Sequence, residues 1–131
     1  MGMHRILVKC VVNYGSDYLL LQKWYDDRID DPYQWEFPEG EVEFGESPER
    51  AAERIVEEAT GINAEAARPL YTWQYTVGEV SNIGICYLLH AYDTETVLSE
   101  DYTDAAWIDR FEFADYIQNQ RLLGDIERAD L

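Results

Sequence analysis

Carboxylate side chains are concentrated in residues 39–62, which read EGEVEFGESPERAAERIVEEATGI. The segment opens as an acidic loop with two glycines and continues as a helical pattern that carries Arg54 and Glu58. Carboxylates that converge can bind a divalent cation, because Mg²⁺ prefers oxygen ligands. Such a cation can neutralise an anionic substrate and help to activate an attacking water. The segment therefore raises the hypothesis of a metal-dependent catalytic site.

A helix over about residues 48–60 is predicted to position these groups. Ser47 is a favourable N-cap residue, and Pro48 suits the first helical position because its missing N–H would have no partner there. Apolar residues fall on one face of this helix, and Gly61 is placed to end it in a left-handed conformation. That apolar face consists of Ala51, Ala52, Ile55, Val56 and Ala59.

The other elements are predicted from the periodicity of apolar residues and from turn-forming residues. The expected strands are residues 5–13, 18–24, 33–37, 68–77, 82–92 and 105–109, and helical segments are expected at 111–118 and about 119–130. The first two strands are expected to form one β-hairpin, and the fourth and fifth strands a second one. The order β-β-β-α-β-β-β-α indicates one mixed α/β domain, of the α+β type, over residues 1–131.

The composition limits the classes of partner. The chain has 27 acidic and 10 basic residues and a formal net charge of −17, so duplex nucleic acid and anionic membranes would be repelled. An acidic, lysine-poor composition is typical of proteins from a high-salt cytoplasm, but ordinary acidic proteins have a similar composition, so both alternatives stay open. Cys10 and Cys86 lack the spacing of a zinc site and are expected to be buried free thiols. No signal segment is recognised and no apolar run approaches the ~18 residues of a membrane helix, so a cytoplasmic protein is expected.

The segment GEVEFGESPERAAERIVEEATGI resembles the signature of the Nudix hydrolases. That signature is a glycine, five residues, a glutamate, seven residues and then R-E-U-x-E-E-x-G-U, where U is aliphatic. Seven of its nine specified positions match without a gap: Gly40, Glu46, Arg54, Val56, Glu58, Gly61 and Ile62. The flanking sequences WEFPEG and DAAWIDRFEF are also similar to those of the family. The resemblance implies a Nudix fold, in which a mixed β-sheet is sandwiched between helices.

The resemblance also implies an activity and a set of site residues. Nudix hydrolases cleave a nucleoside diphosphate linked to another group, such as a nucleoside triphosphate or a nucleotide sugar, with Mg²⁺ or Mn²⁺ and water. On this pattern the Gly40 carbonyl and Glu58 would bind the metal, with Glu43 from the acidic loop as a further ligand. Glu58, Arg54 and Asp104 would act in catalysis. Glu46 would form a structural salt bridge with Arg54. Substrate binding is expected from Arg28, Trp35 and Glu39.

Two of the three family acids are missing, because Ile55 and Ala59 occupy their positions. The loop acids Glu39, Glu41 and Glu43, together with Asp104, could rebuild a metal site around Glu58. The leading hypothesis is therefore a Nudix pyrophosphohydrolase for a small-molecule nucleotide, acting as a monomer or homodimer. The alternative is a catalytically inactive Nudix-fold module that binds a nucleotide or another protein.

Overall fold

The computed structural model describes residues 2–24 and 34–131. Its strands are β1 (Met3–Tyr14), β2 (Asp17–Lys23), β3 (Trp35–Glu36), β4 (Glu39–Glu41), β5 (Ala64–Val77), β6 (Val80–Ala91) and β7 (Tyr102–Asp109). Its helices are α1 (Pro48–Thr60), the short 3₁₀ helix η1 (Arg110–Glu112), α2 (Phe113–Tyr116) and α3 (Gln120–Ala129). The elements form an α+β structure, as predicted.

The sheet is mixed. Its order is β3-β2-β1-β6-β5, with β4 also paired to β1 and β7 paired to β2. Strands β1 and β6 run parallel from the Met3–Val80 pair to the Asn13–His90 pair. Both predicted hairpins are present, although β1 and β2 pair only near their turn, where Asn13 lies opposite Tyr18.

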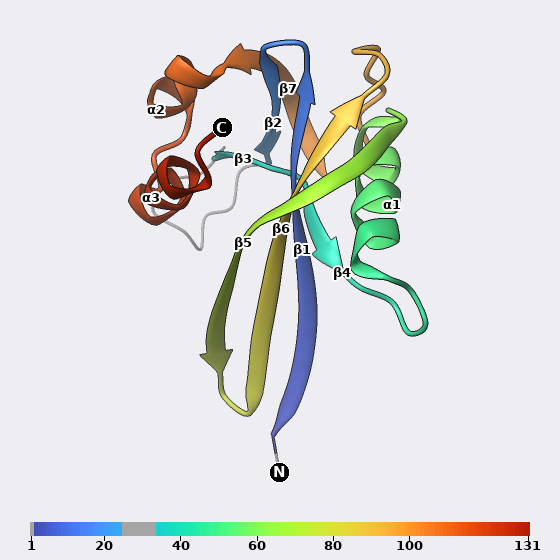
Figure 1. Ribbon diagram of the computed structural model, residues 1–131, viewed down its shortest axis with the longest axis vertical. Coiled ribbons are helices and arrows are strands. Elements are labelled where there is room, and N and C mark those ends of the chain that lie inside the picture. The colour runs from blue at the N-terminus through green and yellow to red at the C-terminus, as the bar shows by residue number, and fades with distance from the viewer. Residues whose placement is uncertain (1, 25–33) are drawn as a thin grey trace.

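Helices cover both faces of this sheet, as Figure 1 shows. Helix α1 packs on one face, where its apolar side chains join those of β1, β2 and β6. Helices α2 and α3 lie on the other face, over a core that contains Phe37, Phe113 and Ile126. The expected sandwich of a mixed sheet between helices is therefore confirmed.

Helix α1 begins and ends where its sequence predicts. The Ser47 hydroxyl accepts a hydrogen bond of 3.2 Å from the backbone N–H of Arg50, which is one of the donors left free at a helix start. Gly61 ends the helix with φ of 71°, a left-handed conformation that glycine adopts without steric cost. The capping residues predicted from the sequence therefore set where α1 begins and ends.

Three of the predicted elements need correction. The structure places strand β4 at Glu39–Glu41, where the sequence indicated only a loop, because pairing with β1 satisfies its backbone groups. The segment 111–118, predicted as one helix, is divided between η1 and α2. The predicted strand 33–37 contains Trp35–Glu36 as its paired part, and its first residue lies outside the described ranges.

Both cysteines are buried free thiols, as expected. No helix in the described part of the chain is long and apolar enough to cross a membrane.

Candidate functional site

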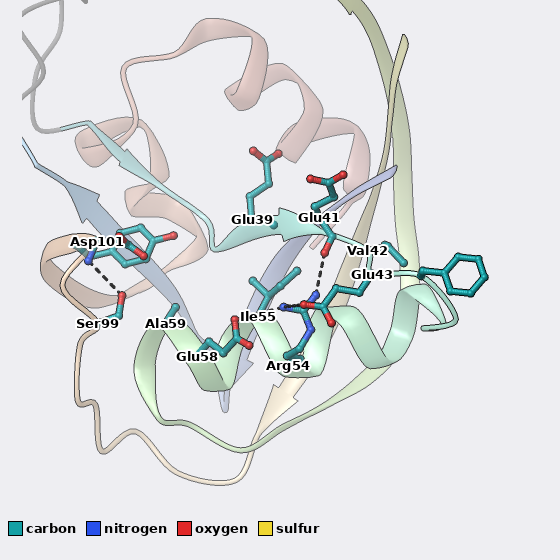
Figure 2. Close-up of a pocket in the computed structure, with 13 residues that line it drawn as sticks. Glu39, Glu41, Val42, Glu43, Arg54, Ile55, Glu58, Ala59, Ser99 and Asp101 are labelled. Carbon is teal, nitrogen blue, oxygen red and sulfur yellow. Dashed lines mark hydrogen bonds and ion pairs between the residues drawn. The ribbon is translucent and has the colours of Figure 1, made fainter. Parts of the chain in front are cut away.

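A hollow of about 570 Å³ lies where β4, the loop after it and α1 meet. It is also lined by residues 99, 101 and 102, which come from the segment before β7 and from its first residue. Figure 2 shows this hollow with the side chains that surround it. The segment of residues 39–62 that carries the Nudix resemblance forms most of its wall.

Strand geometry separates the loop acids from helix α1. Gly40 faces the helix, since a β-carbon added to it would lie 2.9 Å from Ile55 Cδ1. Side chains alternate between the two faces of a strand, so Glu39 and Glu41 face away from α1. Figure 2 shows both carboxylates directed to the far side of β4 from the helix. Neither carboxylate therefore converges on Glu58.

Arg54 ties the acidic loop to the helix. Its Nε donates to Glu46 Oε2 at 2.8 Å, and one terminal nitrogen donates to Glu46 Oε1 at 3.0 Å and to the Glu41 carbonyl at 2.8 Å. The other terminal nitrogen lies 3.3 Å from a Glu58 oxygen and 3.7 Å from a Glu43 oxygen. The two carboxylates predicted to bind a metal, Glu58 and Glu43, are therefore ion-paired with an arginine.

Arg54 also lowers the pKa of its partner Glu46. The hydrogen bond from Arg54 holds the pKa of Glu46 below its usual value, with a smaller contribution from the backbone N–H of Glu43. The same hydrogen bond raises the pKa of Arg54 above its already high value. Both groups are therefore charged across the neutral pH range, which keeps the loop attached to α1.

Ile55 and Ala59 make the helix face toward the hollow apolar. Each is only 6% exposed, and both belong to the core cluster between α1 and the sheet. The side chain of Ile55 packs directly against Gly40, whose carbonyl was expected to bind a metal. An isoleucine supplies no oxygen ligand at this point, and neither does an alanine one turn later.

The residues present do not fit the divalent metal that the family implies. Within residues 2–24 and 34–131, no group of three or more His, Cys, Asp or Glu side chains is placed to hold a metal ion. Glu43 and Glu58 are largely exposed and approach Arg54, while Glu39 and Glu41 point to the other side of β4. No catalytic step through a metal is therefore derived from this geometry.

The other predicted site residues lie in different places. Asp104 is exposed on β7, where its carboxylate accepts a 2.8 Å hydrogen bond from the N–H of Ala105, and it is not among the residues that line the hollow. Trp35 packs edge-on against Tyr116 on the face covered by α2, with ring centroids 5.3 Å apart. Arg28 lies outside the described residues. The structure thus does not bring Asp104 or Trp35 to Glu58.

Three lining residues come from outside residues 39–62 and were not predicted from the sequence. Ser99, Asp101 and Tyr102 precede or begin β7, and the backbone N–H of Asp101 donates to the Ser99 hydroxyl at 3.3 Å. Burial raises the pKa of Tyr102 to about 12, so its hydroxyl stays protonated. No local sequence pattern predicts these residues at the site. The backbone N–H of Ser99 donates to the Ala59 carbonyl at 2.9 Å, which holds this segment against the end of α1, and β7 then pairs with β2.

The hollow has a strongly negative lining. Its lining residues include five acids, Glu39, Glu41, Glu43, Glu58 and Asp101, and a single arginine, Arg54, although the carboxylates of Glu39 and Glu41 point to the far side of β4. The Arg54 guanidinium is already bonded to Glu46 and to the Glu41 carbonyl. An anion that enters without a cation meets like charges, which is unfavourable.

The fold and the loop-helix segment together define a Nudix domain. The family model described as "NUDIX domain" matches residues 3–124, and the chain belongs to this family. Among solved structures, the MutT protein from Methanosarcina mazei Go1 has a TM-score of 0.79 and 20% identity, with 98% of this chain and 94% of that chain covered. The E. coli ORF135 protein has a TM-score of 0.73 and 23% identity, with 97% and 89% covered. A C. elegans Ap4A hydrolase in a binary complex has a TM-score of 0.76 and 18% identity, with 96% and 95% covered.

Proposed function

We propose that this Nudix domain binds a small-molecule nucleotide and does not hydrolyse it by the metal-dependent route of the family. Membership of the family and the likeness to an Ap4A hydrolase support a nucleotide as the ligand class. The contact between Ile55 and Gly40 is the observation that carries the rest of the proposal. It fills the space beside the expected carbonyl ligand with apolar atoms, which cannot bind Mg²⁺ or Mn²⁺.

The leading hypothesis from the sequence, a Nudix pyrophosphohydrolase, needs a site rebuilt from loop acids. Glu39 and Glu41 face away from α1, and Asp104 does not line the hollow. Glu43 and Glu58 are both ion-paired with Arg54. Asp101 also lines the hollow, but within residues 2–24 and 34–131 it forms no group of three with other acids that could hold a metal ion. This arrangement favours the inactive module over the hydrolase, while the net charge of −17 supports a partner other than nucleic acid. A cytoplasmic location and a monomeric or homodimeric state are part of the same proposal.

The test compares the wild-type protein with a variant that restores the family acids. Wild type, Ile55→Glu/Ala59→Glu and the uncharged control Ile55→Gln/Ala59→Gln are incubated with nucleoside triphosphates, ADP-ribose and dinucleoside polyphosphates plus Mg²⁺ or Mn²⁺. We expect no metal-dependent turnover by wild type or by the glutamine control. We expect the glutamate variant to gain metal-dependent turnover, or at least a higher melting temperature in Mg²⁺ than in EDTA. Circular dichroism establishes that each variant is folded.

The wild-type protein alone can overturn the proposal. Metal-dependent cleavage of any nucleotide in the panel, lost in Glu58→Gln, would establish the hydrolase instead. Calorimetric titration of wild type with AMP, ADP and ATP in EDTA tests the binding part separately. Absence of binding to all three would remove the nucleotide as the ligand class.

A further inference from the structure

Strand β5 forms an open edge of the sheet. It is the last strand in the order β3-β2-β1-β6-β5, and among the described strands it pairs only with β6. The end of β5 and its turn into β6 extend beyond the helices, as Figure 1 shows. The backbone N–H and C=O groups on the outer side of an edge strand can pair with another strand. The outer side of β5 is therefore a surface on which a further strand can dock.

The outer part of β5 lacks the charges that protect a sheet edge. Residues 69–78 contain no charged side chain, although the chain has a net charge of −17. The other strands with a single described partner each carry acids, which are Glu36 in β3, Glu39 and Glu41 in β4, and Asp104 in β7. Charged side chains on an edge strand oppose pairing with a second chain. Among these edges, β5 is therefore the one that a second acidic chain approaches with the least repulsion.

The turn into β6 determines which backbone groups of β5 face outward. Val77 and Val80 lie opposite each other across the two-residue turn Gly78-Glu79, and Gly78 has a φ of 59°. The residues that flank such a turn form a hydrogen-bonded pair. Hydrogen-bonded pairs alternate along an antiparallel ladder with pairs whose N–H and C=O groups point away from the partner strand. By this alternation, the residues of β5 whose backbone groups point away from β6 include Thr72, Gln74 and Thr76.

These three residues lie in a segment whose pattern is symmetric. Residues 72–76 read TWQYT, so an antiparallel second copy centred on Gln74 brings each residue opposite a similar one. Gln74 then faces Gln74 of the second copy, Thr72 faces Thr76, and Trp73 faces Tyr75. Threonine pairs and aromatic pairs that lie directly opposite each other stabilise antiparallel strands. In this register the outward N–H and C=O groups are also the ones that meet across the contact, so they can form hydrogen-bonded pairs.

We propose that two copies of this chain pair through β5 and form a twofold-symmetric dimer with one continuous sheet. Both copies use the same surface, which is the commonest arrangement in homodimers. Extending the register beyond the strands brings Glu79 of one copy toward Arg68 of the other, so opposite charges meet at each end of the contact. Within residues 2–24 and 34–131, neither Arg68 nor Glu79 takes part in an ion pair. The dimer does not depend on the proposed nucleotide binding.

Irregularities in β5 limit the length of this contact. The register of β5 against β6 shifts between Ala66 and Arg68 and again between Pro69 and Tyr71. Proline has no N–H to donate, and a bulge twists an edge strand away from a partner. The paired segment is therefore residues 71–77, which makes a contact at the small end of the range for protein interfaces. We expect a monomer–dimer equilibrium that depends on protein concentration.

Sedimentation equilibrium of the full chain and of its Gln74 variants tests the dimer. Gln74→Glu and Gln74→Lys each place like charges opposite each other at the twofold axis, so each should weaken dimerisation about tenfold. An equal mixture of the two variants should restore dimerisation, because an ammonium then lies opposite a carboxylate. Ser16→Glu and Ser16→Lys are the matched controls. They add the same charges to the exposed turn between β1 and β2, away from β5 in the sheet, and should change dimerisation little.

Amide hydrogen exchange gives a second readout at the edge itself. The backbone N–H groups of Thr72, Gln74 and Thr76 should exchange with D₂O more slowly at protein concentrations at which the dimer forms. Circular dichroism establishes that each variant is folded.

Three outcomes would overturn the proposal. A wild type that stays monomeric at near-millimolar concentration removes a second copy as the partner of β5. A dimer that persists in both Gln74 variants, or that their mixture does not restore, means that the copies do not pair in this register. Species larger than a dimer mean open-ended association instead of a closed twofold contact.

Discussion

Ile55 packs so closely against Gly40 that a β-carbon at residue 40 would lie 2.9 Å from both its Cδ1 and its Cγ1 atoms. Glycine at this position therefore has a packing role in addition to the one implied by the family signature. The contact joins strand β4 to the middle of α1 and seals the core at the inner end of the hollow. Ile55 thus makes an apolar contact at a position where the family signature has a carboxylate that could bind a metal.

The first prediction concerns this contact. Gly40→Ala should lower the free energy of unfolding by about 1–3 kcal/mol, because an added methyl group overpacks a filled site. The loss should be smaller when Ile55→Ala is already present, since that change removes the atoms with which the methyl collides. Urea denaturation of the four proteins in the cycle measures the coupling.

A matched glycine provides the control for this cycle. A β-carbon on Gly124 in helix α3 would meet nothing within 4 Å, so Gly124→Ala should stabilise the protein by about 0.5–1 kcal/mol. Equal losses from Gly40→Ala in both backgrounds would mean that Ile55 does not enforce glycine at residue 40.

The second prediction concerns Glu36, whose carboxylate lies 3.0 Å from the Lys23 ammonium. Burial raises the pKa of Glu36 above its ordinary value of 4.5, although Lys23 acts to lower it. The folded state then binds this proton more tightly than the unfolded state, so the contribution to stability is present below pH 4.5 and is lost as pH rises through the folded pKa. Glu36→Gln should therefore gain stability relative to wild type as the pH increases from acid to neutral.

Thermal unfolding across this pH range checks the prediction. The comparison is best made with Lys23→Gln present in both proteins, because Glu36→Gln alone leaves the lysine without its partner. A difference between the two proteins that does not change with pH would contradict the raised pKa.

The sequence alone predicts the elements that depend on local signals. Helix α1 was placed correctly because Ser47, Pro48 and Gly61 act on their own neighbours. Strand β4 was missed because its three residues pair with β1, about thirty residues earlier in the chain, and carry no periodicity of their own. The hollow is lined by residues of β4, of α1 and of the segment that leads into β7, which are distant in the sequence. The presence of Asp101 in the lining and the orientation of Glu39 therefore could not be deduced from residue spacing.

The third prediction concerns the cysteines. Burial raises the pKa of the Cys86 thiol to about 12 and that of the Cys10 thiol well above its ordinary value. The thiolate is the reactive form, so neither residue should react readily with a disulfide reagent at neutral pH. Reaction with Ellman's reagent should be slow in the native protein and fast in denaturant, with two thiols released. Fast reaction of the native protein would contradict the burial of these thiols.

The last prediction is that the coupling free energy of the Arg54–Glu46 pair exceeds that of an ordinary surface ion pair. Arg54 makes two hydrogen bonds to Glu46 and one to the Glu41 carbonyl, whereas Arg50 reaches Glu53 with a single contact of 3.4 Å. The Arg50–Glu53 coupling should be about 0.2–0.5 kcal/mol, as for other pairs on one helix surface. A double-mutant cycle with Arg54→Gln and Glu46→Gln should give a larger coupling, because the guanidinium fork matches a carboxylate.

The pH dependence of this coupling follows from the pKa of Glu46, which Arg54 lowers below 4.5. The folded state releases this proton more readily, so the coupling is present above pH 4.5 and is lost as pH falls through the lower folded pKa. Arg54→Lys should recover only part of it, since an ammonium cannot form the two parallel bonds. If the coupling matched that of Arg50 and Glu53 at neutral pH, then the acidic loop would be held by β4 and Ile55 and not by Arg54.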